Sequence, residues 1–376
     1  MATVPFDGAK LDSLLEEARI DALLVSSRHN VRYLTGGYYD HFHALATRGG
    51  SGQYVPFVGI PRGRFDAAFY VGSMGEKRQL EAMPIWIPAI HLNGGNGPNA
   101  ARVAASLLKD RVGTSATIGV ELPFLPADAF QSLQRDLPHA RFVDATDLLH
   151  ELRAIKTPAE LAILRRVADG VAGAIQATFR AAHDGITTRE LSSVVAYQMA
   201  SRGIEFLWSF TCAGPSFLRA PSSMVWERGQ ILHLDCGGEI GDYLADICRL
   251  GSRGEPSALA RELHAECLQL QNDIRRFVRP GTTYRELAEA GEEALRALPH
   301  AEIGRFVAHG IGMVSHEQPM IAARSDRRLE AGMVLSIETE FLHPSVGHVK
   351  IEDVVAVTPD GYEGMGDIGR EWQIVE

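Results

Sequence analysis

The stretch Ile231–Leu250, ILHLDCGGEIGDYLADICRL, contains two apolar arms on either side of a short polar turn. The alternating arms predict two strands, and Gly241 stands where a tight hairpin turn favours positive φ. With the turn at Ile240–Gly241, the register places Asp235 directly opposite Asp246. Side chains paired in this way lie ~4.5–5.5 Å apart, and two carboxylates at that separation repel each other. We therefore infer a divalent metal between them; a turn shifted by one residue, with one aspartate in solvent, is the alternative.

A second pair of acids stands in the C-terminal stretch 333–358, MVLSIETEFLHPSVGHVKIEDVVAVT. Strand-like arms, Met333–Ile337 and Val354–Val357, flank the loop HPSVG. Glu338 and Glu352 stand at corresponding ends of these arms, where apolar residues are expected. Two such acid pairs in one part of the chain favour a metal centre over chance.

The run His309–Pro319, HGIGMVSHEQP, lies between the two acid pairs and supplies imidazoles. Gly310 and Gly312 permit close backbone approach, and His316 follows later in the same run. A lone histidine in a glycine-rich turn is usually structural, but four acids change that interpretation. Oxygen ligands with one nitrogen suit Mn, Co, Zn or Fe(II), and four carboxylates can hold two ions.

The composition restricts the partners. The chain has 376 residues, with 37 basic and 47 acidic side chains and a net charge of −10. Nucleic acids and anionic membranes bind clustered Lys and Arg, so the acidic excess argues against both. Four cysteines without a C-x-x-C pair predict buried or incidental thiols. We find no signal peptide and no apolar run of ~18 residues, so we expect a soluble, cytoplasmic protein.

The first part of the chain has the pattern of a small α/β domain. A helical pattern covers Leu11–Ala18, and apolar runs predict strands at Asp21–Ser26, Ala67–Val71, Thr117–Glu121 and Arg141–Asp144. A long helix is expected to begin after Thr157, because Pro158 and Glu160 complete a helix start. The sequence therefore predicts two domains, residues 1–154 and residues 155–376.

The second predicted domain contains an internal repeat. Gly185–Leu191 matches Gly281–Leu287 at an offset of 96 residues. Each segment pairs a threonine with a glutamate three residues later, a capping box that begins an amphipathic helix. We infer a duplicated unit of helices and strands, with a cleft on the pseudo-twofold axis where residues of both halves converge.

Taken together, these residues make the chain resemble the pita-bread metallohydrolases, which include aminopeptidase P, prolidase, methionine aminopeptidase and creatinase. All five positions of that family's metal set are matched, by Asp235, Asp246, His309, Glu338 and Glu352. The N-terminal part resembles the creatinase/prolidase N-terminal domain, with Val31–Gly36 following a DALLVS strand. The resemblance implies an α+β fold: a pita-bread domain with a pseudo-twofold duplicated half, preceded by a small α/β creatinase-type domain.

The resemblance also implies a dinuclear centre and assigns roles within it. Asp235 would bind one ion, and Asp246 and Glu352 would bridge to the other, which His309 and Glu338 complete. Glu338 would also transfer a proton, and His316 would stabilise the oxyanion. Manganese is the expected metal, with cobalt, zinc or iron as alternatives, and a homodimer is the expected assembly.

Three departures from the family pattern concern the substrate. The family peptidases carry a substrate-contacting histidine upstream of the first aspartate, where this chain has Leu218 and Arg219 in GPSFLRAPSS. The usual E-P-G is Glu338-Thr-Glu340, and the arginine of R-I-E-D is Lys350. Arg219 is a candidate for contacting a substrate carboxylate, with a surface arginine as the alternative.

The expected activity is hydrolysis of an amide or peptide bond by a two-metal enzyme, with Xaa-Pro dipeptides as the default substrates. The alternative keeps the metals but acts on a small non-peptide C–N compound, as ectoine hydrolase or creatinase does, or as a lyase. A non-catalytic binding module is disfavoured, because four clustered acids without metal cost stability. His41 and His43 receive no role: they fit a polar surface loop or, as in dimeric relatives, a contribution to a neighbouring active site.

Overall fold

The computed structural model describes residues 4–43 and 54–376. The chain divides into two compact units, Met1–Leu152 and Arg153–Glu376. The boundary expected after residue 154 falls two residues beyond Leu152. Residues 44–53, part of the stretch that contains His41 and His43, lie outside the described residues.

The first unit is built on a six-stranded mixed sheet with the order β4-β3-β2-β1-β5-β6. Leu23 and Val25 of β1 face one apolar cluster, whereas Ala22 and Leu24 face another, so this strand is buried on both faces. The strands are β1 Ala22–Val25, β2 Phe57–Pro61, β3 Phe69–Val71, β4 Ala89–His91, β5 Thr117–Val120 and β6 Arg141–Asp144. The helices are α1 Gly8–Glu17, α2 Arg28–Thr35, α4 Lys77–Ala82, α5 Gly97–Val112, α6 Ala127–Asp136 and α7 Thr146–Leu152, with short 3-10 turns η1 Phe65–Ala67 and η2 Met74–Glu76.

The second unit is built on a nine-stranded sheet, whose main path is β11-β10-β12-β13-β9-β8-β7. Its strands are β7 Glu205–Ala213, β8 Ile231–Ile240, β9 Tyr243–Arg253, β10 Gly304–Gly310, β11 Glu317–Met320, β12 Val334–His343, β13 Gly347–Val357, β14 Tyr362–Met365 and β15 Gln373–Val375. Its helices are α8 Pro158–Ala181, α9 Thr188–Ala200, α10 Ala258–Arg275 and α11 Tyr284–Arg296, with the 3-10 turn η3 Ala301–Ile303. Within the parts of the chain described here, we find no helix of the length and apolarity that a membrane crossing requires.

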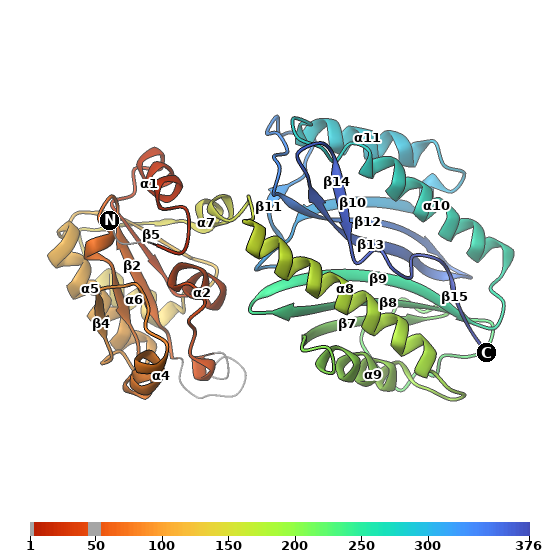
Figure 1. Ribbon diagram of the computed structural model, residues 1–376, viewed down its shortest axis with the longest axis horizontal. Helices are drawn as coiled ribbons and strands as arrows, with labels where there is room; N and C mark the ends of the chain where they lie inside the picture. Colours follow the sequence, from red (N-terminus) through yellow and green to blue (C-terminus); the bar gives the residue numbers. More distant parts are fainter. Residues whose placement is uncertain (1–3, 44–53) are drawn as a thin grey trace. The chain divides into compact units, whose positions relative to one another are not determined.

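The second unit is duplicated. Helices α8 and α9 lie along β7–β9, and α10 and α11 lie along β10, β12 and β13 (Figure 1). Thr187 and Thr283 cap α9 and α11 through the predicted capping boxes. Each of these threonines also forms an isolated antiparallel bridge, to Val225 and to Arg328 respectively. The two halves therefore repeat the same local construction, and they meet where β9 pairs with β13.

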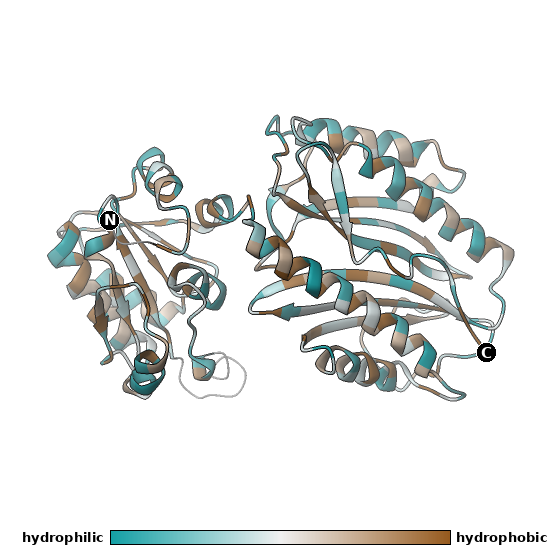
Figure 2. Cartoon of the chain, viewed as in Figure 1, coloured by the Kyte–Doolittle hydropathy of each residue, from teal (hydrophilic) through white to brown (hydrophobic). Residues whose placement is uncertain are grey.

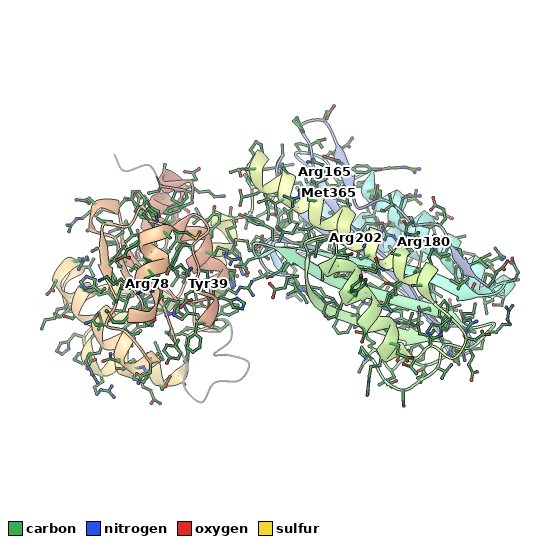
Figure 3. All side chains as sticks on the ribbon, turned by 60° about the horizontal axis from the view of Figure 1, so that its bottom comes forward. Tyr39, Arg78, Arg165, Arg180, Arg202 and Met365 are labelled. Carbon is green, nitrogen blue, oxygen red and sulfur yellow. The ribbon has the colours of Figure 1, made fainter. Side chains whose placement is uncertain are left out.

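The helices cover one face of this sheet because alternate strand residues are apolar. Leu232 and Leu234 of β8 join the buried cluster formed with α8, and Ile337 of β12 joins the cluster formed with α10. Apolar and polar patches both appear along α8, as expected of an amphipathic helix (Figure 2). Arg165 of α8 forms a paired ion contact with Glu363 of β14, next to the labelled Met365 (Figure 3). The opposite face of the sheet receives the remaining alternate residues.

The register of the β8–β9 hairpin differs from the expected one. Ile240 pairs with Tyr243, so the turn is Gly241–Asp242, and both turn residues have positive φ, 61° and 68°. Asp235 therefore lies opposite Cys248 rather than Asp246. The turn lies one residue later than expected, because aspartate tolerates the left-handed region that a type I′ hairpin turn needs. The partner of Asp235 changes by two residues, and a shift of two keeps both aspartates on the same face of the sheet.

Candidate metal centre

Five neighbouring strands bring the predicted ligands to one face of the second sheet. Glu338 of β12 lies directly opposite Glu352 of β13, as the sequence predicted. Glu352 pairs in turn with Cys248 of β9, which pairs with Asp235 of β8. The two halves of the duplicated unit thus contribute to one polar surface. The candidate ligands, each from its own strand, are Asp235 on β8, Asp246 on β9, His309 on β10, Glu338 on β12 and Glu352 on β13.

These residues form two adjoining groups. Ligand atoms of Asp235, Asp246 and Glu352 all lie within 4.8 Å of one another. Potential ligand atoms of His309, His316 and Glu338 also lie within 4.8 Å of one another. His309 Nε2 lies 3.1 Å from Glu338 Oε1. The structure therefore brings together every residue that the sequence nominated for metal binding, together with His316. Their roles as ligands remain predictions.

The chemistry of this donor set fits a divalent cation. Asp235, Asp246 and Glu352 are buried, at 1%, 9% and 0% exposure. Within the described residues, Asp235 Oδ1 and Asp246 Oδ1 are buried without a hydrogen-bond partner. A buried carboxylate oxygen without a partner is costly unless a cation or a donor meets it. Carboxylate oxygens with one imidazole are the ligands that first-row divalent ions accept.

The acids of the first group are not all stabilised as anions by the chain itself. Burial raises the pKa of Asp246 well above its usual range, and the charges of Glu352 and Asp235 act in the same direction. Burial likewise raises the pKa of Glu352 to about 7. A bound divalent cation would reverse both effects, because it favours the charged form of each carboxylate.

Lys350 of β13 also lies inside the centre. Its Nζ forms ion pairs with Asp235, Glu338 and Glu352. Although burial opposes ionisation of Glu338, the hydrogen bond from His309 and the charge of Lys350 lower its pKa to about 2. The sequence had marked Lys350 only as a departure from the family arginine.

Sequence reasoning missed a chain of polar residues beside the centre. His348 Nε2 lies 2.7 Å from Glu340 Oε2, and Arg305 Nε lies 3.1 Å from Glu340 Oε1. The ring of His348 stacks on His233, with centroids 4.1 Å apart. His233 and His348 each stand two residues before Asp235 and Lys350, so the two-residue period of a strand could have identified both.

Arg219 lies at the mouth of the centre. Its side chain is 46% exposed, yet Nη2 lies 3.1 Å from Asp235 Oδ2. The guanidinium stacks over Phe210, 4.2 Å from the ring centroid. A cavity of about 470 Å³ opens here, lined by Arg219, Arg305, Glu338 and Lys350 and by the apolar Phe217 and Leu342. Arg219 is therefore an exposed residue that also contacts a predicted ligand.

The first unit holds His41 and His43 in different environments. His41 is exposed, whereas His43 is buried, and its Nε2 lies 3.4 Å from Glu76 Oε1. Tyr38 and Tyr70 also donate to Glu76. The expectation of a polar surface loop is therefore wrong for His43, because a buried carboxylate recruits this imidazole into the core.

Comparison with known proteins agrees with this geometry. The family model described as metallopeptidase family M24 matches residues 162–359, more than half of the chain and all five candidate ligands. The chain belongs to metallopeptidase family M24. The model of the creatinase/prolidase N-terminal domain matches residues 9–155. Membership in the M24 family confirms the prediction of a metallohydrolase, and divalent metals are what this family uses.

Individual M24 relatives match nearly the whole chain. An Xaa-Pro dipeptidase from Lactobacillus delbrueckii subsp. lactis is 26% identical over 378 residues, covering 97% of this chain and 98% of the relative. An Xaa-Pro dipeptidase from Pyrococcus horikoshii is 24% identical over 368 residues, covering 96% and 97%. The structure of an Xaa-Pro dipeptidase from Bacillus anthracis superposes with a TM-score of 0.83 at 25% identity, covering 98% and 99%. The predicted fold, a pita-bread domain preceded by a creatinase-type domain, is confirmed.

Proposed function

We propose that this chain is a dinuclear metallopeptidase that hydrolyses Xaa-Pro dipeptides, in the manner of a prolidase or aminopeptidase P. One observation carries the proposal: Glu338 and Glu352 face each other, with His309 on the adjacent strand, beside an open cavity. The relatives named Xaa-Pro dipeptidases support the choice of substrate. Residues 155–376 would form the catalytic domain, and residues 1–154 the creatinase-type domain.

The proposed cofactor is a pair of divalent ions, manganese first, with cobalt, zinc or iron as alternatives. Asp235, Asp246 and Glu352 would hold one ion, and His309 and Glu338 would complete the other, with Asp246 and Glu352 shared. Bound ions would polarise the scissile carbonyl and lower the pKa of water. The two buried carboxylate oxygens without hydrogen-bond partners support this assignment.

Two side chains are proposed to act on the reacting groups. In the metal-free chain, Glu338 is ionised because the hydrogen bond from His309 and the charge of Lys350 outweigh its burial. With metal bound, its carboxylate would accept a proton and pass it to the leaving amine. The pKa of His316 is lowered, by partial burial and then by the charge of His309, so its imidazole is neutral at pH 7. A neutral imidazole still has one N–H, which would donate to the developing oxyanion.

The cavity supplies a place for the rest of the dipeptide. Phe217, Leu342 and Pro344 form an apolar wall against which a proline ring can pack. Arg219 on the same cavity would pair with the C-terminal carboxylate, as arginine suits planar carboxylates. The substrate would then span from this arginine to the carboxylates of the centre.

The test is hydrolysis of Ala-Pro and Gly-Pro by the manganese-loaded protein. We expect turnover that Glu338→Gln abolishes, because the amide keeps the shape of the side chain but can neither accept the proton nor bind metal as a carboxylate does. Silence on a panel of Xaa-Pro dipeptides, with metal bound, would overturn the dipeptidase assignment. That result would favour the alternative of a small non-peptide C–N substrate.

Assembly and location belong to the same proposal. A homodimer is proposed from the resemblance and is tested by light scattering on the eluted protein. A cytoplasmic location is proposed because the four cysteines are free and buried, a pattern that suits a reducing compartment.

A further inference from the structure

Lys350 places a fixed positive charge among the predicted metal ligands. Its Nζ lies 2.9 Å from Asp235 Oδ2, 2.8 Å from Glu338 Oε2 and 2.7 Å from Glu352 Oε2. The side chain is only 5% exposed. An ammonium has three N–H donors, and here three carboxylates surround it. Its position is therefore that of a cation bound by the centre rather than that of a surface lysine.

The ammonium competes unequally with the two metal positions. Asp235 and Glu352, two of its partners, belong to the same ligand group as Asp246. In the second group, Glu338 is the one residue that pairs with Lys350 among the described ion pairs. This group also contains His309, which offers a nitrogen atom to a metal. A divalent ion at the Asp235 side must therefore displace the ammonium, since two cations a few ångströms apart at a buried site repel strongly.

We propose that Lys350 is a built-in counter-ion, which occupies the Asp235 side of the centre in the metal-free protein and is displaced when the second ion binds. The inference rests on the proposed metal centre. It makes the two positions unequal: the ion at the His309 side binds tightly, and the ion at the Asp235 side binds weakly. It also explains how the chain folds around four clustered carboxylates before metal arrives.

The departure from the family arginine is essential to this role. A guanidinium is a larger, planar fork with fixed donor directions, whereas an ammonium is a compact point charge. The compact ammonium of Lys350 sits among oxygens from three strands, Asp235 of β8, Glu338 of β12 and Glu352 of its own strand. Lys350→Arg therefore separates the effect of charge from the effect of occupying the site.

The experiment is a calorimetric titration of the metal-free full chain with Mn²⁺, with bound metal counted by elemental analysis. We expect two sites in the wild type, the second weaker by at least about tenfold. Lys350→Gln should strengthen the second site by about ten- to a hundredfold, which is the scale of a charge-assisted contact. Lys350→Arg should strengthen the second site as well, because we expect the larger guanidinium to lie outside the position between the three carboxylates. Without metal, Lys350→Gln should melt at a lower temperature than the wild type.

Arg276→Gln is the matched control, because it removes one positive charge from an exposed pair with Asp273 on α10. It should leave both sites unchanged. Two equally tight sites in the wild type, or a second site indifferent to Lys350→Gln, would overturn the inference while leaving the proposed function in place. Unequal, lysine-dependent sites without turnover of any Xaa-Pro dipeptide would instead overturn the proposed function. If Lys350→Arg binds the second Mn²⁺ as weakly as the wild type does, the positive charge alone weakens the site. The proposal that the ammonium is displaced is then rejected.

Discussion

The imidazole of His316 lies flat against that of His309, with ring centroids 3.9 Å apart and planes inclined by 15°. His309 is buried, whereas His316 is exposed at the edge of the centre. The buried ring therefore orients the exposed ring, whose position suits contact with a substrate.

Replacing His316 tests that role. In His316→Ala we expect kcat to fall about 10²–10³-fold, the usual loss when one donor to an oxyanion is removed. Bound metal should stay at the wild-type amount, measured by elemental analysis. His316→Gln, which keeps an N–H donor, should recover part of the rate. A loss of metal in His316→Ala would show that the residue acts as a ligand instead.

Asp246→Asn separates metal binding from folding. Because burial raises the pKa of Asp246, its charge is costly without metal, and the neutral amide should leave the metal-free Tm unchanged or higher. Saturating Mn²⁺ should raise the Tm of the wild type by about 5–10 °C and that of the variant hardly at all. Thermal melts with and without chelator measure both values. An equal rise in both proteins would remove Asp246 from the ligand set; the exposed Asp360→Asn is the control.

Arg219→Gln tests recognition of the substrate carboxylate. We expect KM for Ala-Pro to rise about 10–100-fold, since a charge-assisted contact is lost, with a smaller change in kcat. Ala-Pro amide, which lacks the carboxylate, should be a poor substrate for the wild type and equally poor for the variant. Because Arg219 also contacts Asp235, bound metal is measured in parallel. An unchanged KM for Ala-Pro would identify Arg219 as a surface residue.

Glu317 makes part of the stability depend on pH. This carboxylate is fully buried between Arg153 and Lys156, at 3.0 and 2.8 Å. Burial alone would raise its pKa, but the two cations lower it from 4.5 to about 2. A depressed folded-state pKa stabilises the protein above pH 4.5 and loses that contribution as the pH falls toward 2. The contribution is about 3 kcal/mol at neutral pH.

Glu317→Gln should therefore lower the free energy of unfolding by about 3–5 kcal/mol at pH 7, because it removes the carboxylate that two buried cations share. The difference from the wild type should shrink at pH 3, measured by urea unfolding followed by tryptophan fluorescence. Glu363→Gln, which breaks the more exposed pair with Arg165, should cost at most about 1 kcal/mol at either pH. A deficit for Glu317→Gln that is the same at both pH values would contradict this assignment.

The β8–β9 hairpin shows which structural features could be predicted from the sequence and which could not. Its alternation identified both strands and put Asp235 and Asp246 on one face. The register was wrong by two residues, because the choice between Ile240–Gly241 and Gly241–Asp242 depends on whether Asp242 accepts positive φ. The prediction that Asp235 and Asp246 share a face is still correct, because side chains return to the same face every two residues along a strand.

The sequence by itself determined the candidate ligands, the strands of the two hairpins that carry the four acids, and the duplicated helix starts at Thr187 and Thr283, since capping and alternation are local properties. It placed His309 in a glycine-rich turn, whereas this residue lies on β10. Only the tertiary structure decided that Glu352 of one half pairs with Cys248 of the other, which joins the acid pairs into one centre. It alone placed Lys350 among three carboxylates and recruited His43 into the core. These contacts join residues distant in the chain, and their energy depends on burial and on neighbours that no local pattern encodes.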